Sequence, residues 1–329
     1  MTAGTDRSFF PARTPKADKP RRVGITHLLD RVAEPLDPEW LSNVAPYVDI
    51  VKIGWCLPLL IPRETTRRRI QAYHRAGIDV STGGTLLEYA VSTGREKEAI
   101  ADAKQMGFDI VEVSEGILDL SPAAVEGLVA EVRSQKLDVL VEVGKKDAQH
   151  QYSLRETLER VSHARRLHPR KVILESRESG TGVGIYDEQG AIKWDWVHAL
   201  VASHPLEDLL FEAPLESQQI GLIVELGADV NLGNVAMGSA LPLATQRRGL
   251  RGDTFGKAGR RQPPKGSPAT KFVYFLIESH GGLDQGELVT LSRLPRRTVQ
   301  ASLNDLKRQG LVRESISFRD ARRREYRCT

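Results

Sequence analysis

Five apolar segments of the chain each carry one charged residue between apolar neighbours. Successive side chains of a strand alternate between its two faces, so a charge in this position is buried unless that face meets solvent or a ligand. Replacing buried ion pairs with apolar residues usually costs no stability, so a set of such charges indicates that something charged is bound there. Carboxylates suit a hard divalent cation, and ammonium groups suit an anionic substrate. The five residues are Lys52, Glu112, Glu142, Glu175 and Glu212.

Two further cations follow these segments at even spacing. Lys146 would share a face with Glu142, and Arg177 would share a face with Glu175. The alternative interpretation is that the acids and bases neutralise one another in ion pairs inside the protein. For any single residue, both interpretations stay open.

The charged residues belong to a repeated pattern of strand and helix. Short apolar runs alternate with segments that carry apolar residues at helical spacing, such as 63–76, 95–106, 122–135 and 154–167. Eight such units over residues 22–256 predict a (β/α)8 barrel, in which active sites lie at the C-terminal ends of the strands. The strands are expected at residues 23–28, 48–54, 78–82, 110–115, 139–145, 171–177, 209–213 and 229–233.

An open doubly wound sheet is the alternative architecture for the same alternation. It is disfavoured because no glycine-rich phosphate loop follows the first strand. The glycine cluster at residues 180–184 is not followed by a helix start, and we interpret it as a mobile loop over the barrel mouth. The arginine-rich segment 247–254 follows the eighth strand, where barrels commonly bind phosphate, and it favours a phosphorylated anion.

Charge divides the chain into segments with different expected partners. Residues 1–22 hold 6 cations against 2 acids, residues 23–256 hold 25 against 34, and residues 257–329 hold 16 against 7. An acidic body with a basic tail region indicates two units. Two distant cysteines, Cys56 and Cys328, favour a reducing compartment. The chain shows no secretory or membrane-spanning segment, so we expect a cytoplasmic protein.

In the basic region, helices are predicted at 270–279, 286–292 and 295–309, followed by a hairpin at 310–318 with a basic tip at 319–324. This pattern resembles archaeal winged-helix transcription regulators over about 60 residues. We expect a disordered arm at 1–21, a linker at 257–267 and a winged helix at 268–329. A winged helix used for protein contact or dimerisation is the alternative. The candidate DNA-binding residues on the third helix are Arg296, Arg297, Gln300 and Asn304.

Motifs spread over residues 23–257 resemble the phosphosulfolactate synthases. They include Val51-Lys52-Ile53-Gly54-Trp55, Gly83-Gly84-Thr85-Leu86-Leu87-Glu88, Glu142-Val143-Gly144-Lys145-Lys146 and Arg248-Gly249-Leu250-Arg251-Gly252-Asp253-Thr254. The resemblance implies a Mg²⁺-dependent barrel that adds sulfite to phosphoenolpyruvate, giving 2-phospho-3-sulfolactate on the path to coenzyme M. A homo-oligomer is also expected.

The resemblance also implies roles for individual residues. Lys146 becomes the candidate electrophile or proton donor, and Lys52 and Arg31 are further catalytic candidates. The acids Glu112, Glu142, Glu175 and Glu212 are candidate Mg²⁺ ligands, with no choice made among them. The candidate substrate-binding residues are Arg177, Arg251, Lys145 and Asn231.

Two positions depart from the family pattern. The usual Asp-Lys-Gly after the first strand is Asp30-Arg31-Val32 here, and Cys56 replaces a glycine. Arginine keeps its charge but cannot act as an acid or base in place of lysine. The alternative function is therefore a transcription regulator whose barrel senses a phosphorylated anion while the C-terminal module binds DNA.

Overall fold

Eight parallel strands close into a barrel in the first of the two compact units of this computed structural model, which are residues Met1–Gly259 and Arg260–Thr329. The structure describes residues 19–32, 35–255, 264–280, 283–316 and 324–328. The predicted arm up to residue 18, most of the predicted linker and residues 319–323 of the predicted tip lie outside the described residues.

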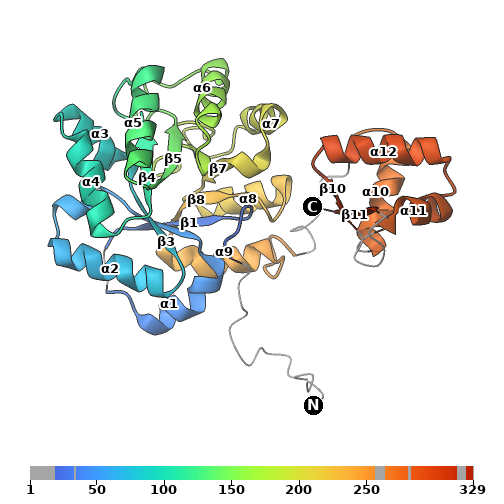
Figure 1. The fold of residues 1–329 in the computed structure, drawn as a ribbon, viewed down its shortest axis with the longest axis horizontal. Coiled ribbons are helices and arrows are strands. Elements are labelled where there is room, and N and C mark those ends of the chain that lie inside the picture. Colours follow the sequence, from blue (N-terminus) through green and yellow to red (C-terminus); the bar gives the residue numbers. More distant parts are fainter. Residues whose placement is uncertain (1–18, 33–34, 256–263, 281–282, 317–323, 329) are drawn as a thin grey trace, which may run out of the picture. The chain divides into compact units, whose positions relative to one another are not determined.

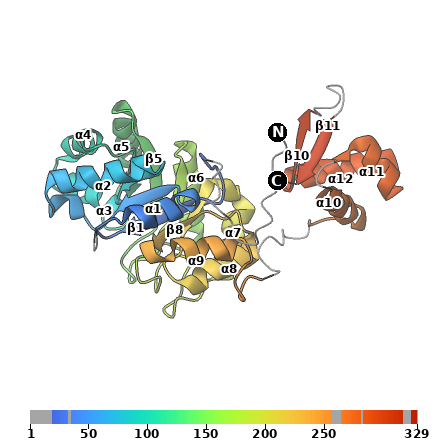
Figure 2. The same cartoon turned by 90° about the horizontal axis from the view of Figure 1, so that it is seen from below.

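The strand order confirms the predicted barrel and excludes the open sheet, because β1 pairs with both β2 and β8. The charged residues therefore lie in a closed cylinder with an inner and an outer face. Figures 1 and 2 show the helices outside the strands. The strands are β1 (Thr26–Asp30), β2 (Ile50–Ile53), β3 (Asp79–Thr82), β4 (Ile110–Ser114), β5 (Asp138–Val143), β6 (Lys171–Leu174), β7 (Leu209–Glu212) and β8 (Leu232–Ala236).

The helices of this unit begin at residues that favour helix starts. Ser153 caps α6 with a reciprocal capping box to Glu156, and Ser121 accepts a backbone hydrogen bond at the start of α5, which opens with Pro122. Helices α2, α4, α5 and α6 match the predicted segments within one residue at either end. The helices are α1 (Pro38–Val44), α2 (Arg63–Arg75), α3 (Gly84–Ser92), α4 (Glu96–Met106), α5 (Pro122–Ser134), α6 (Leu154–Arg166), α7 (Trp194–Ser203), α8 (Glu216–Leu226) and α9 (Ala240–Arg247).

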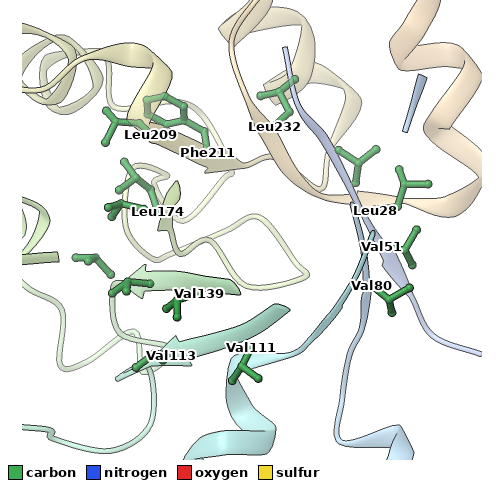
Figure 3. Packing of buried hydrophobic residues seen from close by; sticks show 14 of the residues in the cluster. Leu28, Val51, Val80, Val111, Val113, Val139, Leu174, Leu209, Phe211 and Leu232 are labelled. Carbon is green, nitrogen blue, oxygen red and sulfur yellow. The ribbon is translucent and has the colours of Figure 1, made fainter. Parts of the chain in front are cut away.

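The outer face of the barrel is apolar and packs against the helices. Figure 3 shows strand residues of this cluster, among them Val111 and Val113 on β4 and Phe211 on β7. Because strand side chains alternate, the residues between them point into the barrel. The inner face begins with a separate apolar layer made of Ile25, Ile50, Ile110, Leu140, Ile173 and Leu210.

A polar layer lies one step further along each of these strands. The residue two positions after each member of the apolar layer is charged or is a histidine, and all six are buried. This spacing of two places them on the inner face, toward the C-terminal ends of the strands. The six residues are His27, Lys52, Glu112, Glu142, Glu175 and Glu212.

Several strand boundaries differ from the prediction. Strand β1 begins at Thr26 instead of residue 23, β8 begins at Leu232 instead of residue 229, and β6 ends at Leu174 instead of residue 177. Arg21, expected in the arm, belongs to the barrel unit because its guanidinium binds both carboxylate oxygens of Asp49, at 2.9 and 2.8 Å. Asp49 is only 5% exposed, so the arginine neutralises a buried charge.

The second unit holds three helices and a three-stranded antiparallel sheet of order β10-β11-β9. The predicted helices and hairpin are present, and the short strand β9 was not predicted. A buried cluster that includes Val273, Leu288, Leu303 and Val312 holds the elements together. The elements are α10 (Pro268–His280), β9 (Leu283–Asp284), α11 (Gln285–Ser292), α12 (Arg296–Arg308), β10 (Val312–Ile316) and β11 (Arg324–Cys328).

No helix within the described ranges is both long enough and apolar enough to cross a bilayer.

The inner apolar layer predicts a large effect of truncation at Ile173, which is 0% exposed. We expect Ile173→Ala to lower the free energy of unfolding by about 3 kcal/mol, because it leaves a cavity inside the closed barrel. Leu60→Ala is the control, since Leu60 is 79% exposed. Urea denaturation measures the free energy of unfolding of both variants. Equal losses would contradict the assignment of Ile173 to a packed inner layer.

Candidate active site

Lys52 on β2 neutralises two glutamates from distant strands inside the barrel. Its Nζ lies 2.9 Å from Glu212 Oε1 on β7 and 3.3 Å from Glu112 Oε2 on β4. His27 Nε2 and Ser81 Oγ lie 3.2 and 2.7 Å from Glu112 Oε1. The side chains of His27, Glu112 and Glu212 are at most 1% exposed, and that of Lys52 is 8% exposed. This Lys52 cluster is therefore an almost solvent-free charge network.

Lys52 and Glu112 each favour the charged form of the other. Burial alone would lower the pKa of Lys52, but the carboxylates of Glu112 and Glu212 outweigh it and raise that pKa above its usual value. Burial alone would raise the pKa of Glu112, but Lys52 and His27 outweigh it and hold that pKa below its usual value. The interpretation that these residues neutralise one another is therefore confirmed for Lys52, Glu112 and Glu212.

Lys146 occupies a second cluster, nearer to solvent. Its Nζ lies 3.1 Å from Glu142 Oε1, 3.2 Å from Glu175 Oε2 and 3.2 Å from Thr85 Oγ1. Ser114 Oγ lies 2.8 Å from Glu142 Oε1. The Lys146 side chain is 25% exposed, while those of Glu142 and Glu175 are 1% and 2% exposed. In this Lys146 cluster, a partly exposed lysine side chain thus ends in an ammonium group beside two buried acids.

Gly144 allows Glu175 to approach β5. Its φ of +141° is a conformation that residues with side chains rarely adopt, and a Cβ built on it would lie 2.6 Å from Glu175 Cβ. Any larger residue would push Glu175 away from Glu142 and Lys146.

The pKa values of Glu142 and Glu175 are shifted in opposite directions, although burial disfavours ionisation of both. Burial raises the pKa of Glu175 well above its usual value, and the charges of Glu142 and Glu212 add to this effect. Burial opposes ionisation of Glu142 as well, but the charge of Lys146 and a hydrogen bond from Glu175 hold the pKa of Glu142 below its usual range. The Glu175 carboxyl is thus easier to protonate than that of Glu142. Four glutamates face only two lysines, so the barrel has room for more positive charge.

Glu142 and Glu175 fit a divalent cation better than all four predicted glutamate ligands together. In the part of the chain that the structure describes, no three His, Cys, Asp or Glu side chains are grouped to hold a metal. Mg²⁺ commonly uses only one or two carboxylates together with water and substrate oxygens. Glu175 Oε2 is buried and accepts no hydrogen bond from the described residues beyond its ion pair with Lys146 Nζ at 3.2 Å, so it has a second lone pair for a cation. Glu112 and Glu212 are instead engaged by Lys52.

Arg31 lies at the surface, outside both clusters. Its guanidinium carbon lies 4.6 Å from the centre of the Trp55 ring, and Trp55 Nε1 donates a 2.8 Å hydrogen bond to Glu178. These contacts connect the segments that follow β1, β2 and β6. Stacking on tryptophan stabilises a cation, so Arg31 is held at the rim and makes no described contact with Lys52 or Lys146.

Arg177 does not share the inner face with Glu175, which corrects the sequence expectation. Strand β6 ends at Leu174, so the alternation of faces stops before Arg177. Arg177 is exposed and has a φ of +58°. Its backbone N–H, not its guanidinium, contacts Glu175, at 2.6 Å from Oε1.

Three predicted substrate contacts are engaged elsewhere. Lys145 Nζ binds the carbonyl oxygens of Glu115 and Leu118, each at 2.9 Å. Arg251 pairs with Glu216, at 3.0 Å. Asn231 is 0% exposed and binds the backbone of Ile25, Leu209 and Glu207 at the N-terminal ends of the strands, the end opposite the mouth.

The prediction that segment 247–254 binds phosphate does not hold for Arg247. The guanidinium of Arg247, the last residue of α9, donates to the carbonyls of Ala228, Val230 and Ile25 at the N-terminal end of the barrel. Because α9 runs away from the mouth, its last residue points to the wrong end for a substrate held there.

Sequence reasoning missed His27, Ser81 and Ser114 in these networks. His27 follows Ile25 by two positions in a strand, which is the same signal that identified the glutamates. The serines gave no such signal, since a small hydroxyl in a strand is common on either face.

The Lys52 cluster predicts a pH-dependent loss of stability in Lys52→Met. Removing the ammonium leaves buried carboxylates without a counter-charge, at a cost of about 3–5 kcal/mol. The pKa of Glu112 then rises above its unfolded value, so the variant is most stable below the unfolded pKa and loses stability as pH rises through the folded one.

Urea denaturation at pH 5 and pH 7 measures the free energy of unfolding of Lys52→Met and of the wild type. The deficit relative to wild type is expected to be larger at pH 7, and Lys52→Met/Glu212→Gln is expected to recover part of it. A deficit that does not change with pH would show that the ammonium does not neutralise Glu112.

Comparison with known proteins identifies the family of the chain. Residues 14–253 match the family model described as (2R)-phospho-3-sulfolactate synthase (ComA). The phosphosulfolactate synthase of Methanocaldococcus jannaschii is 37% identical over 237 residues, which cover 71% of this chain and 94% of that protein. That of Bacillus subtilis is 34% identical over 251 residues, covering 75% and 96%. The chain therefore belongs to the phosphosulfolactate synthase family, a family of lyases.

Proposed function

We propose that the barrel adds sulfite to phosphoenolpyruvate and forms 2-phospho-3-sulfolactate. The observation that carries this proposal is Lys146, whose side chain is 25% exposed and whose ammonium group is held by two buried glutamates just past the C-terminal end of β5. Family membership supports the choice of substrates, since the relatives are phosphosulfolactate synthases.

The reaction needs a positive charge beside the carboxylate of phosphoenolpyruvate, where negative charge develops. The sulfur lone pair of sulfite attacks the methylene carbon of phosphoenolpyruvate, and the electrons of the double bond move to the adjacent carbon and its carboxylate. That carbon then takes up a proton. Burial alone would lower the pKa of Lys146, but Glu142 and Glu175 raise it, so the residue stays an ammonium that can face the developing charge and donate a proton. Lys52 is too deeply buried for this role and acts by neutralising Glu112 and Glu212.

Mg²⁺ completes the proposed site. Glu142 and Glu175 would hold it, because these two buried carboxyl groups share the single ammonium group of Lys146. A bound Mg²⁺ would supply further stabilisation of negative charge on the substrate. Arg31 and Arg177, exposed at the rim, are proposed to attract the anionic substrates to the mouth.

The proposal predicts Mg²⁺- and sulfite-dependent consumption of phosphoenolpyruvate by the purified full chain. We expect Lys146→Ala to lower kcat at least ~10²-fold, because the charge in the transition state loses its partner. Phosphorus NMR identifies the product, and a chelator is expected to stop turnover.

Lys97→Ala is the matched control, since Lys97 is exposed on α4. If folded wild-type protein with Mg²⁺ and sulfite leaves phosphoenolpyruvate unchanged, the synthase proposal is wrong, and the sensor alternative gains support.

We further propose that the C-terminal unit is a winged helix that binds DNA. Its order α10-β9-α11-α12-β10-β11 is that of a winged helix, in which the third helix enters the major groove. Helix α12 buries Val299, Leu303 and Leu306. Its other face exposes Arg296, Arg297 and Asn304.

Gln300 connects this face to the preceding helix. It accepts a 2.7 Å hydrogen bond from Gln285 on α11 and donates one of 3.1 Å to Asn304. The amides of α12 are thus held in place at the exposed surface, as expected for groups that contact base edges.

The DNA proposal predicts salt-sensitive binding of a 30-base-pair duplex by the full chain, measured by fluorescence anisotropy. Arg296→Ala/Arg297→Ala is expected to weaken binding and to reduce the dependence of log Kd on log salt by about 2, one for each lost phosphate contact.

The matched control is Arg67→Ala/Arg68→Ala, an adjacent exposed pair on α2 of the barrel unit. Equal effects of the two double variants would favour the alternative that the C-terminal unit contacts protein.

A further inference from the structure

The loop between β4 and α5 forms a wall along the side chain of Lys146. The backbone N–H of Lys146 donates a 2.9 Å hydrogen bond to the carbonyl of Gly116. A Cβ built on Gly116 would lie 3.1 Å from Lys146 Cγ and 3.2 Å from its Cδ and Cε. Gly116 therefore touches the lysine along most of its aliphatic stem, and residues 115–119 decide where that stem can lie.

Glu88 on α3 holds this loop from one side. The Glu88 side chain is buried, and its Oε1 accepts hydrogen bonds from the backbone N–H groups of Ile117 and Leu118, at 2.7 and 2.9 Å. Its Oε2 lies 3.1 Å from Ser114 Oγ, which also accepts the N–H of Gly116, at 3.1 Å. One carboxylate thus satisfies two consecutive backbone donors in the loop.

Lys145 holds the same loop from the other side. Its buried Nζ binds the carbonyl oxygens of Glu115 and Leu118 and lies 2.6 Å from the carboxylate of Asp119. Glu88 thus engages the donors of the loop and Lys145 its acceptors, and Leu118 is bound by both. The two consecutive lysines have different tasks, since Lys145 binds the loop and Lys146 reaches the acid pair.

We propose that Glu88 and Lys145 are positioning residues that press loop 115–119 against Lys146 and so fix its ammonium between Glu142 and Glu175. The catalytic consequence rests on the proposed function of Lys146. A lysine side chain has several rotatable bonds, and a misplacement of about 1 Å at a reacting group can cost ~10²-fold in rate. Support for the stem is therefore as necessary as the ion pairs at its end.

The first test is Gly116→Ala in the full chain. The φ of Gly116 is not in the left-handed region, so alanine fits the backbone, and the added methyl group must displace the lysine stem. We expect kcat to fall at least ~10-fold while KM for phosphoenolpyruvate and Tm stay near wild type. Gly127→Ala in α5 is the matched control, since a Cβ there meets nothing within 4 Å.

The second test uses the two proposed positioning residues. We expect Glu88→Ala and Lys145→Met each to lower kcat more than they change KM. Glu88→Gln keeps an acceptor oxygen for the loop N–H groups and is expected to recover most of the kcat. A purely structural role would lower Tm in all three variants without this separation of kcat from KM.

A third measurement does not depend on turnover. The rate at which N-hydroxysuccinimide acetate acetylates Lys146, measured by peptide mass spectrometry and normalised to Lys97, is expected to rise at least ~3-fold in Glu88→Ala and Lys145→Met, because a released stem leaves its ion pairs more often. Unchanged labelling overturns the proposal, as does unchanged kcat in a chain that turns over. If labelling rises but wild-type protein does not consume phosphoenolpyruvate, the positioning stands and the synthase proposal fails.

Discussion

The interior of the barrel is governed by the need to neutralise buried carboxylates. Four glutamates point into a closed cylinder, where an unpaired charge would cost several kcal/mol. Lys52 compensates Glu112 and Glu212, and Lys146 lies within ion-pair distance of Glu142 and Glu175. Lys52 on β2 reaches Glu212 on β7 because the sheet closes, whereas Lys146 follows β5 and meets Glu175 at the end of the neighbouring β6. The proposed cation would add positive charge beside Glu142 and Glu175, and the proposed anionic substrate would face that charge.

Depth in the barrel separates two otherwise similar clusters. The Lys52 side chain is 8% exposed and that of Lys146 is 25% exposed, so only the second can meet a solute directly. The inner cluster is almost closed to solvent, and the outer cluster is the one proposed to supply a proton and a positive charge to the substrate. Support for the outer cluster comes from residues that never reach the mouth, because Glu88 and Lys145 act on the backbone of the loop beside Lys146.

The two units of the chain have opposite electrostatic character. The barrel segment holds more acids than bases, yet its mouth gathers cations at the rim, whereas the C-terminal segment is basic overall and displays arginines on one helix. Charge of this kind determines which partners a surface attracts and says nothing of the fold. Each unit also has its own apolar core, so each proposed activity can be assigned to a separate set of side chains.

Local rules in the sequence determined the strand and helix order, the helix starts and the inward direction of Lys52 and the four glutamates, because a spacing of two sets the face of any strand residue. Sequence motifs also determined the family. Only the tertiary structure decided which acid each lysine meets, since Lys52 and Glu212 are 160 residues apart and approach through closure of the sheet. It also decided that Arg177 lies outside, because β6 ends three residues earlier, and that Asn231 lies at the far end of the barrel. The tertiary structure likewise decided that Lys145 binds the loop after β4 while Lys146 binds Glu142 and Glu175. Both lysines follow the end of β5, so the folded loops, and not the alternation of a strand, set where their side chains point.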